Sequence, residues 1–298
     1  MTQPDQKRQE LADRIIAKYE GDNLMHTPLE ALTFYANPNK TGLLATLYEP
    51  SLCIIAQGAK EVSWGDKTLN YHAGMYLLAS VPTPAHVRIV EASKEKPYAG
   101  LTITFSMEQI FEVLKEINND NEGPLSDTPD SLYVTNMDER LQDAVLRLVR
   151  LLDTPEDIKV LAPLITKEIL YMVMRTEGVD LIRQFIREGS LTQRVVKAIS
   201  GIKEEFSEKL NVKELAKSVG MSESSLYANF KKITRMTPLQ FQKQLRLQEA
   251  KRILLTQEIE IAQAAYEVGY ESPSQFSREY SRMFGLPPKE DIKRTLSV

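Results

Sequence analysis

The sequence of 298 residues contains few cysteines, few histidines and no long apolar run. A single cysteine, Cys53, excludes an internal disulfide and a zinc site built from several cysteines. A membrane-spanning helix needs roughly 18 consecutive apolar residues, and no run approaches that length. The charged first ten residues lack the apolar core of a secretion signal. We therefore expect a cytoplasmic protein without a membrane partner.

The net charge is also small, at −4, and taken over the whole chain it argues against a nucleic-acid partner. At about 150 residues per domain, however, the length suggests two domains. Residues 1–190 contain 19 lysines and arginines against 28 aspartates and glutamates, a net charge of −9. Residues 191–298 contain 18 against 13, a net charge of +5. This asymmetry favours a polyanionic partner for the C-terminal part.

Between about residues 41 and 106 the sequence consists of short apolar runs separated by turn residues. The runs are 43–48, 51–57, 61–64, 68–71, 75–79, 86–90 and 98–105, and the turns include Gln57-Gly58, Gly65-Asp66, Ala73-Gly74 and Pro82-Thr83-Pro84. Many short strands at such spacing are typical of an antiparallel sandwich or a small barrel.

Helical patterns flank this β region. Helices are predicted at 5–20, 107–117, 138–152 and 157–175, with a polar loop at 118–130 and further helical sequence to about 187. The helix at 157–175 is apolar on more than one face, so it needs partners in its own domain or in another subunit. We place the end of this first domain, residues 1–190, near Gly189.

The C-terminal part contains an internal repeat. The ten residues Val212–Met221 match Ile261–Tyr270, 49 residues later. Each copy is followed by a second helix with an apolar pair four residues apart, Leu226 and Phe230 in the first and Phe276 and Tyr280 in the second. One extra residue in the second turn changes the offset to 50.

Each copy has the residues that a helix-turn-helix requires. Ala216 and Ala265 are small where two helices cross, and Gly220 and Gly269 follow a helix end, where a left-handed residue turns the chain. Ser222 and Ser272 are placed to cap the next helix, and Pro273 suits its first position. Two helix-turn-helix units are therefore predicted, at about 212–233 and 260–284.

A long helix at about 238–255 separates the two copies. A helix of about 17 residues is some 26 Å long at 1.5 Å per residue. It could hold two recognition helices about one DNA turn apart, about 34 Å, so that both enter the same face of one duplex.

The motifs of the C-terminal part resemble those of the AraC/XylS family of bacterial transcription regulators. They are Leu215-Ala216, Gly220-Met221-Ser222, Phe230-Lys231, Pro238, Arg246-Leu247, Ala250, Val268-Gly269-Tyr270, Phe276-Ser277-Arg278 and Phe284-Gly285-x-Pro287. The N-terminal part is similar to one subgroup of that family. Its motifs include Tyr48-Glu49-Pro50, Cys53, Gln57-Gly58, Tyr71, Gly74, Pro97-Tyr98 and Leu152-Asp153-Thr154-Pro155. Arg235 departs from the family pattern, which commonly has glycine close to this position.

The resemblance implies an α+β fold. Its parts are an N-terminal cupin-like antiparallel β-barrel that senses a signal, flanking helices that form a homodimer, and a C-terminal all-α double helix-turn-helix domain at 191–298. It implies base contacts by Ser224, Tyr227 and Ala228 on the first recognition helix and by Ser274, Gln275, Ser277 and Arg278 on the second. Lys231, Lys232 and Arg282 are better suited to phosphates.

The chemistry of these side chains sets what each could read. Ala228 could contact only a thymine methyl, whereas glutamine suits adenine and arginine suits guanine. The alternative is that these polar residues form an ordinary solvated face.

Other residues leave a choice between packing and chemistry. His72 and His86 are the only histidines of the β region, and no His-x-His pair suggests a metal site, so we expect no metal, no cofactor and no catalytic residues. Cys53 is either a buried packing residue or a thiol that reacts with an electrophile. Trp64 either braces the hairpin at Gly65-Asp66 or lines an effector pocket.

We therefore expect a sequence-specific DNA-binding transcription regulator that responds to a small-molecule effector in its N-terminal barrel. Its partners would be an operator in double-stranded DNA, a second copy of the chain and an effector of unknown identity, with RNA polymerase as a further candidate. Two alternatives stay open: an enzyme on the cupin barrel with a DNA-binding appendage, and a constitutive DNA binder whose N-terminal part only dimerises.

Overall fold

The computed structural model describes residues 3–21, 24–117, 131–175, 191–257 and 259–296. The chain divides into two compact units, one formed mainly by residues up to 187 and the other mainly by residues 188–298. We call them the N-terminal and C-terminal units. The predicted loop at 118–130, the helical sequence after 175 and the predicted boundary near Gly189 lie outside the described residues.

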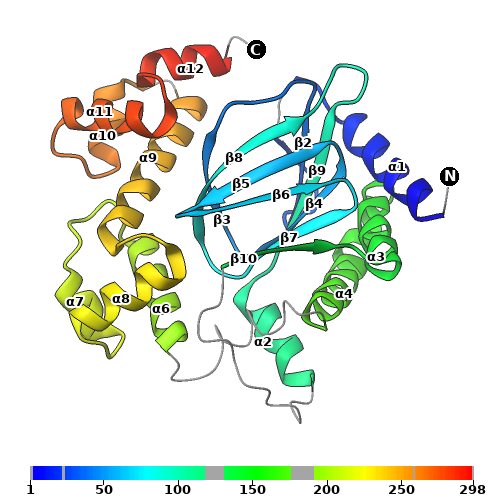
Figure 1. Cartoon of the computed structure of the whole chain (residues 1–298), viewed down its shortest axis with the longest axis horizontal. Helices are drawn as coiled ribbons and strands as arrows, with labels where there is room; N and C mark the ends of the chain where they lie inside the picture. Colours follow the sequence, from blue (N-terminus) through cyan, green and yellow to red (C-terminus); the bar gives the residue numbers. More distant parts are fainter. Residues whose placement is uncertain (1–2, 22–23, 118–130, 176–190, 258, 297–298) are drawn as a thin grey trace. The chain divides into compact units, whose positions relative to one another are not determined.

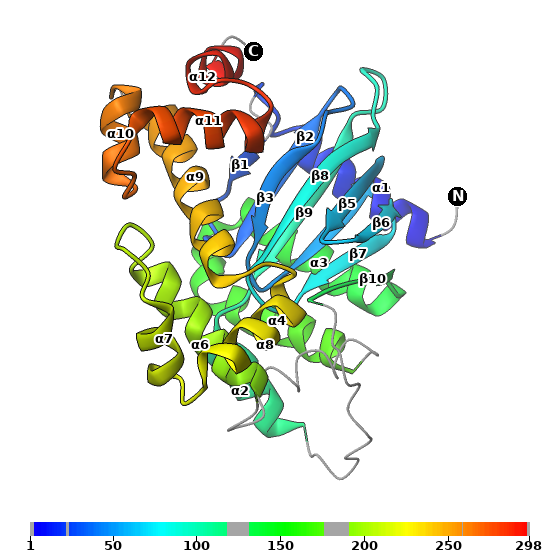
Figure 2. The same ribbon diagram turned by 60° about the vertical axis from the view of Figure 1, so that its left-hand side comes forward.

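The N-terminal unit contains two β-sheets with helices packed beside them (Figures 1 and 2). The six-stranded sheet has the order β1 (Leu24–His26), β2 (Leu32–Asn37), β9 (Tyr98–Thr104), β4 (Ser51–Gln57), β7 (Met75–Ala79) and β10 (Leu132–Asn136). The four-stranded sheet has the order β3 (Leu44–Tyr48), β8 (Thr83–Glu91), β5 (Ala59–Trp64) and β6 (Lys67–His72). The antiparallel β-sheets and flanking helices of the expected fold are confirmed, whereas closure into a barrel stays a prediction.

The strands extend beyond the range 41–106 that the sequence pattern indicated. β1 and β2 precede it, and β10 follows it and pairs antiparallel with β7 from Leu132–Ala79 to Asn136–Met75. β8 also begins at Thr83, inside the segment that we interpreted as a turn, because proline is tolerated near the first residue of a strand. Strands as short as β1 have too few residues for an alternating pattern to show.

The described helices of this unit are α1 (Gln3–Ile16), α2 (Met107–Glu116), α3 (Glu139–Arg150), the short 3₁₀ turn Leu151–Asp153 and α4 (Pro155–Met174). Local signals explain where they start. Ser106 and Gln109 form a capping box at α2, and the Asp138 carboxylate accepts the Leu141 N–H at α3. An apolar core joins the six-stranded sheet to α1, α3 and α4 through residues such as Ile15, Ile54 and Val145.

In the described residues after 190, the C-terminal unit consists of helices and the turns that connect them. Its helices are α6 (Leu191–Glu204), α7 (Val212–Ser218), α8 (Glu223–Thr234), α9 (Pro238–Thr256), α10 (Ile261–Glu267), α11 (Pro273–Phe284) and α12 (Pro288–Leu296). α7 and α10 begin 49 residues apart, and α8 and α11 begin 50 apart. The repeat, its offset and the long intervening helix are therefore confirmed.

Each copy of the repeat has its own aromatic packing. In the first, the Phe230 ring on α8 meets the Phe241 ring on α9 edge-on, with centroids 5.5 Å apart. In the second, Phe276 packs against Tyr270 and Tyr280 in a buried cluster that includes Ala264 and Ala265. Because α9 contributes to both, it is a structural part of each copy as well as the connection between them.

Candidate nucleic-acid interface

The turns of the two copies have the same backbone geometry. Gly220 and Gly269 have left-handed φ angles of 67° and 85°. The Met221 N–H donates to the Ala216 carbonyl, and the Tyr270 N–H donates to the Ala265 carbonyl, each at 2.9 Å. This pattern is a Schellman motif, which ends a helix and turns the chain at a left-handed residue. The role predicted for the two glycines is confirmed.

The second helix of each copy also begins in the same way. The Ser222 hydroxyl accepts the Ser225 N–H at 3.2 Å, and the Ser272 hydroxyl accepts the Gln275 N–H at 3.4 Å. Pro273 occupies the first position of α11. The equivalent turns and caps make α7–α8 and α10–α11 two versions of one helix-turn-helix.

All ten candidate DNA contacts lie on solvent-accessible sides of α8 and α11. The exposed ones are Ser224, Ala228, Lys231, Lys232, Ser274, Gln275, Arg278 and Arg282, and the half-buried ones are Tyr227 and Ser277. Leu226, Phe230, Phe276 and Tyr280 bury the opposite sides. Within each helix the candidates recur at spacings of three and four residues, so they share one face.

The Gln275 side chain is hydrogen-bonded to a carboxylate that also has other partners. Its amide donates to the Glu279 carboxylate at 3.3 Å, and that carboxylate also accepts the Tyr270 hydroxyl at 2.9 Å and pairs with the Lys243 ammonium at 3.0 Å. Burial acts to raise the pKa of Glu279, but these hydrogen bonds outweigh it and leave the pKa below its ordinary value. A base contact by Gln275 would therefore compete with Glu279.

Arg278 differs from Gln275 in having no competing contact. Its side chain is exposed and makes no hydrogen bond or ion pair with any residue in the described ranges. Because guanidinium is always charged and can donate two parallel hydrogen bonds, Arg278 is free to meet a guanine edge or a phosphate.

Arg235 occupies a strained position at the end of α8. Its φ is 61°, and it is the one residue other than glycine with a positive φ in the part of the chain that the structure describes. Gly285 occupies the equivalent position at the end of α11, with φ of 80°. The departure from the family pattern thus falls on a left-handed residue, where a side chain costs about 1–2 kcal/mol.

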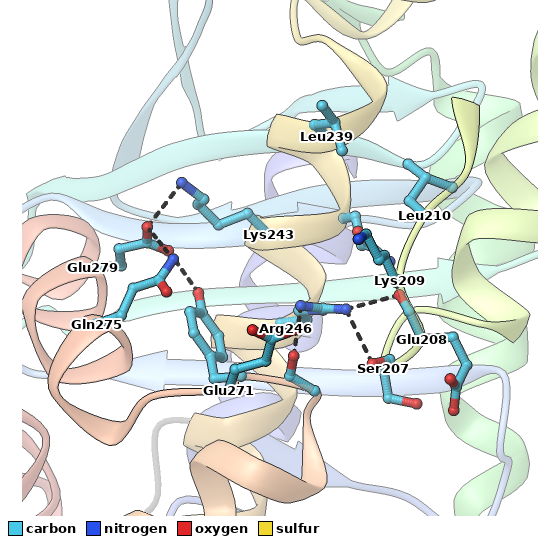
Figure 3. Close-up of a pocket in the computed structure, with 13 residues that line it drawn as sticks. Ser207, Glu208, Lys209, Leu210, Leu239, Lys243, Arg246, Glu271, Gln275 and Glu279 are labelled. Carbon is cyan, nitrogen blue, oxygen red and sulfur yellow. Dashed lines mark hydrogen bonds and ion pairs between the residues drawn. The ribbon is translucent and has the colours of Figure 1, made fainter. Parts of the chain in front are cut away.

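The side chain of Arg246 on α9 adds a further connection between the two copies. It links the segment before α7 to the turn after α10. Its guanidinium donates to the carbonyls of Phe206 (2.7 Å), Ser207 (3.0 Å), Glu208 (2.8 Å) and Gly269 (2.8 Å). Figure 3 shows it between the segment that leads into α7 and the turn that leads into α11. Its half-buried position beside the Tyr270 ring adds packing to these hydrogen bonds.

The main chain at Gly269 also packs closely against the main chain of the segment before α7. A Cβ atom at Gly269 would overlap the Ser207 carbonyl, so no larger residue fits there. The Gln242 amide on α9 also donates to the carbonyls of Phe206 (3.0 Å) and Glu208 (2.7 Å). The spacing of the two copies is therefore held by packed and hydrogen-bonded contacts, and α9 does not act as a free linker.

Sequence reasoning gave Arg246 no role, although it belonged to a recognised motif. Its partners lie 23 to 40 residues away and are main-chain carbonyls, which no residue type marks. α6 was also missed, but its signal was present, because Val195, Ile199 and Ile202 have helical spacing and are all buried.

Comparison with known proteins identifies both units. Residues 28–180 match the model of the AraC-type transcriptional regulator N-terminus, and residues 215–294 match a helix-turn-helix domain. The chain belongs to the AraC family of transcriptional regulators. The family is one of regulators and not of enzymes.

Curated relatives match this AraC-family chain in part. The thermoregulatory protein LcrF of Yersinia pestis is 24% identical over 65% of this chain and 69% of its own length. The regulator ArgR of Pseudomonas aeruginosa is 30% identical, and the match covers 38% of each protein. Histidine kinase P4 of Formosa agariphila is 32% identical over 28% of this chain, which is 6% of the kinase. The chain thus spans well under half the length of several relatives that it matches.

Solved structures agree on the fold. An apo form of a ToxT variant from Vibrio cholerae superposes with a TM-score of 0.62 at 11% identity, over 88% of this chain and 97% of ToxT. Wild-type ToxT bound to an unsaturated fatty acid gives 0.56 at 11% identity, over 87% and 94%. At such identity the likeness extends to the architecture alone.

Cys53 and Trp64, the two candidates for effector binding, are both buried in the N-terminal unit. Burial raises the pKa of Cys53, and its sulfur accepts a hydrogen bond from the Thr102 hydroxyl at 3.4 Å. Both observations favour a packing role over a reactive thiolate. Trp64 is buried at the end of β5, and its indole N–H has no hydrogen-bond partner among the described residues.

The histidines considered as metal ligands lie at the surface. His72 and His86 are exposed, and the His72 ring lies 3.1 Å from the Ala73 carbonyl. No group of three or more histidine, cysteine, aspartate or glutamate residues that could hold a metal ion occurs in the described ranges. In the same ranges, no helix is long and apolar enough to cross a membrane.

Proposed function

We propose that the protein is a sequence-specific DNA-binding regulator whose two recognition helices, α8 and α11, enter successive major-groove segments of one duplex. The observation that carries this proposal is the pair of equivalent helix-turn-helix units joined by Arg246 and α9. A rigid spacing between the two helices restricts binding to DNA sites whose half-sites match it. The positive net charge after residue 190 supplies attraction to phosphates.

The candidate contacts divide by chemistry. Arg278, Gln275, Ser274 and Ser277 on α11 would read bases, with Ser224, Tyr227 and Ala228 on α8. Lys231, Lys232 and Arg282 near the ends of the same helices would contact phosphates, which set affinity and register but carry no sequence information.

A second copy of the chain is the proposed partner for α4. Large apolar side chains on this helix are exposed: Val160 (66%), Leu164 (61%) and Tyr171 (44%). Their spacing of four and seven residues places them on one side of the helix. A groove of about 660 Å³ beside them is lined by Leu161, Leu164 and Ile165 and rimmed by charged residues. Such a patch suits an interface between like helices. RNA polymerase remains a candidate partner without an assigned surface.

The N-terminal unit would bind the effector. ToxT, which shares the fold, has been crystallised with an unsaturated fatty acid bound. In this chain β4 links the interior to the helices, because Ile54 packs into the core shared with α3 and α4 while Cys53 points to the other side of the sheet. An effector between the sheets could thus favour one arrangement of α3 and α4, and so one spacing of the DNA-binding units in a dimer.

Selection of bound fragments from random-sequence DNA tests this proposal. The full chain should enrich one recurring sequence, and a protein-free metabolite extract of the source cells should change its affinity or its footprint. An enriched sequence whose affinity and footprint the extract leaves unchanged would favour the constitutive DNA binder. No enrichment at all would contradict sequence-specific binding.

A further inference from the structure

Six side chains with polar end groups come together between the two sheets of the N-terminal unit. Tyr35 (β2), Cys53 (β4) and Tyr98 (β9) come from the six-stranded sheet, and Tyr48 (β3), Lys60 (β5) and Tyr71 (β6) come from the four-stranded sheet. We call these six residues the intersheet cluster. The opposite face of the six-stranded sheet packs into a mainly apolar core shared with α1, α3 and α4, which includes the tyrosine Tyr76.

Lys60 provides the positive charge of the intersheet cluster. Its ammonium reaches across from β5 to lie 5.4 Å from the centroid of the Tyr98 ring and 5.6 Å from that of Tyr35. No carboxylate and no hydrogen-bond acceptor contacts it within the described part of the chain. Lys60 is half-buried, and this partial loss of water lowers the pKa of its ammonium.

The other members of the cluster supply no negative charge. Burial raises the pKa of Tyr35 to about 12 and raises those of Tyr48, Tyr71 and Tyr98 further, so all four hydroxyls stay protonated at neutral pH. Burial also raises the pKa of Cys53. The Tyr71 hydroxyl approaches the Tyr48 hydroxyl as a donor, and the buried Tyr48 hydroxyl makes no other hydrogen bond among the described residues. The cluster thus has a cation and a hydroxyl proton that can still be donated, and its described members include no anion.

A charged group without a counter-ion in this position destabilises the folded state. Lys60 is half-buried, so its unpaired charge loses hydration on folding, and contacts with aromatic rings return only part of that loss. A methionine or leucine at position 60 would pack beside Tyr35 and Tyr98 without that cost. The lysine is therefore better explained by an anion that binds here than by the stability of the unliganded fold.

We propose that the intersheet cluster binds the carboxylate of a small organic acid, with Lys60 as its counter-ion. This inference rests on the proposed effector function of the N-terminal unit. One ammonium neutralises one negative charge, which matches a monocarboxylate better than a phosphate dianion. The four tyrosine rings suit an apolar or aromatic carbon body, and the Tyr48 hydroxyl can donate a hydrogen bond to the carboxylate.

Thermal unfolding of the full chain tests the inference without operator DNA. A protein-free metabolite extract of the source cells is separated on an anion exchanger into anionic and non-anionic fractions, and the anionic fraction is treated with phosphatase. We expect the phosphatase-treated anionic fraction to raise the unfolding temperature of the wild type and of the control variant Lys94→Met, which changes an exposed lysine of the same unit. The same fraction should leave Lys60→Met unchanged.

The remaining outcomes of the thermal unfolding experiment contradict either the carboxylate site alone or the effector function as a whole. A rise with the non-anionic fraction alone, a rise that phosphatase abolishes, or an equal rise for Lys60→Met would overturn the carboxylate site while leaving an effector-binding unit in place. If no fraction raises the unfolding temperature of the wild type, the proposed effector function fails as well.

The unliganded variant provides a second, independent test. Without any extract, Lys60→Met should unfold at the same temperature as the wild type or at a higher one, because it removes a charge that lacks a counter-ion. A fall of several degrees relative to Lys94→Met would show that Lys60 stabilises the unliganded fold and would overturn the inference.

Discussion

Ala228 on α8 and Arg278 on α11 lie 50 residues apart and occupy the same position of two equivalent helices. The turns and caps around them are the same in both copies, but one exposes a methyl group and the other a guanidinium. The same offset pairs Ser225 with Gln275 and Lys232 with Arg282. The two copies thus have the same backbone turns and caps but different side chains on their exposed helix faces. We infer that α11 carries most of the base reading and α8 carries more of the general attraction to DNA.

The largest expected effect is a loss of stability when the hydrogen bonds of Arg246, which connect the two copies, are removed. Arg246→Met removes hydrogen bonds to four main-chain carbonyls, so the free energy of unfolding should fall by about 2–3 kcal/mol. Urea denaturation measures this change. Arg252→Met is the matched control on the same helix, because Arg252 is exposed and its ion pair with Glu249 is local; its cost should stay within about 0.5 kcal/mol. Equal losses in the two variants would show that Arg246 does not join the copies.

The next effect concerns base reading by α11. Arg278→Ala should weaken binding to a selected DNA site by about 1–3 kcal/mol and relax the preference at one base pair. The mirror change, Ala228→Arg, should add a preference for guanine in the other segment, because it places the guanidinium at the equivalent position of α8. Competition binding with single-base variants of the site measures both. An equal loss for Arg278→Ala on all sequences would make Arg278 a phosphate contact.

A smaller effect is expected from the phosphate contact on α8. Lys231 is exposed in the last turn of the helix. Lys231→Ala should weaken binding to all sequences alike and reduce the slope of log affinity against log salt by about 1. Fluorescence anisotropy over a series of salt concentrations measures the slope. A sequence-dependent loss with an unchanged slope would assign Lys231 to base reading instead.

The smallest effect is expected at the helix ends. There the first copy carries the arginine, Arg235, and the second copy carries the smaller residue, Gly285. Arg235→Gly should stabilise the protein by about 0.5–1 kcal/mol, since glycine removes the strain of a positive φ but gains freedom in the unfolded chain. Gly285→Ala should destabilise it by about 1 kcal/mol, because the position has open space and only the φ angle opposes a side chain. Urea denaturation of both variants would refute the strain argument if Arg235→Gly lowered the stability.

The features that sequence reasoning predicted correctly are those with local causes. Gly220, Gly269, Ser222 and Ser272 act within five residues of their own positions, so their spacing alone indicates the turns and caps. β10 was missed because its place depends on pairing with β7, more than 50 residues away in sequence.

The residues that sequence reasoning overlooked act at long range. The carbonyls that Arg246 binds have no identity in the sequence. The intersheet cluster draws on strands from β2 to β9, so Lys60 gives no signal until the two sheets are assembled. The ten candidate DNA contacts could be placed on exposed helix faces from the repeat, but which base each of the seven base-contact candidates would read depends on the DNA.

Methylation interference on a selected DNA site tests the central claim most directly. Methyl groups on guanine N7 project into the major groove and block a helix that lies there. We expect interfering guanines in two clusters about one helical turn apart on one face of the duplex. The cluster that contacts α11 should weaken in Arg278→Ala and the other should persist. A single cluster, or two clusters on opposite faces, would contradict a rigid pair of recognition helices that read one face of DNA.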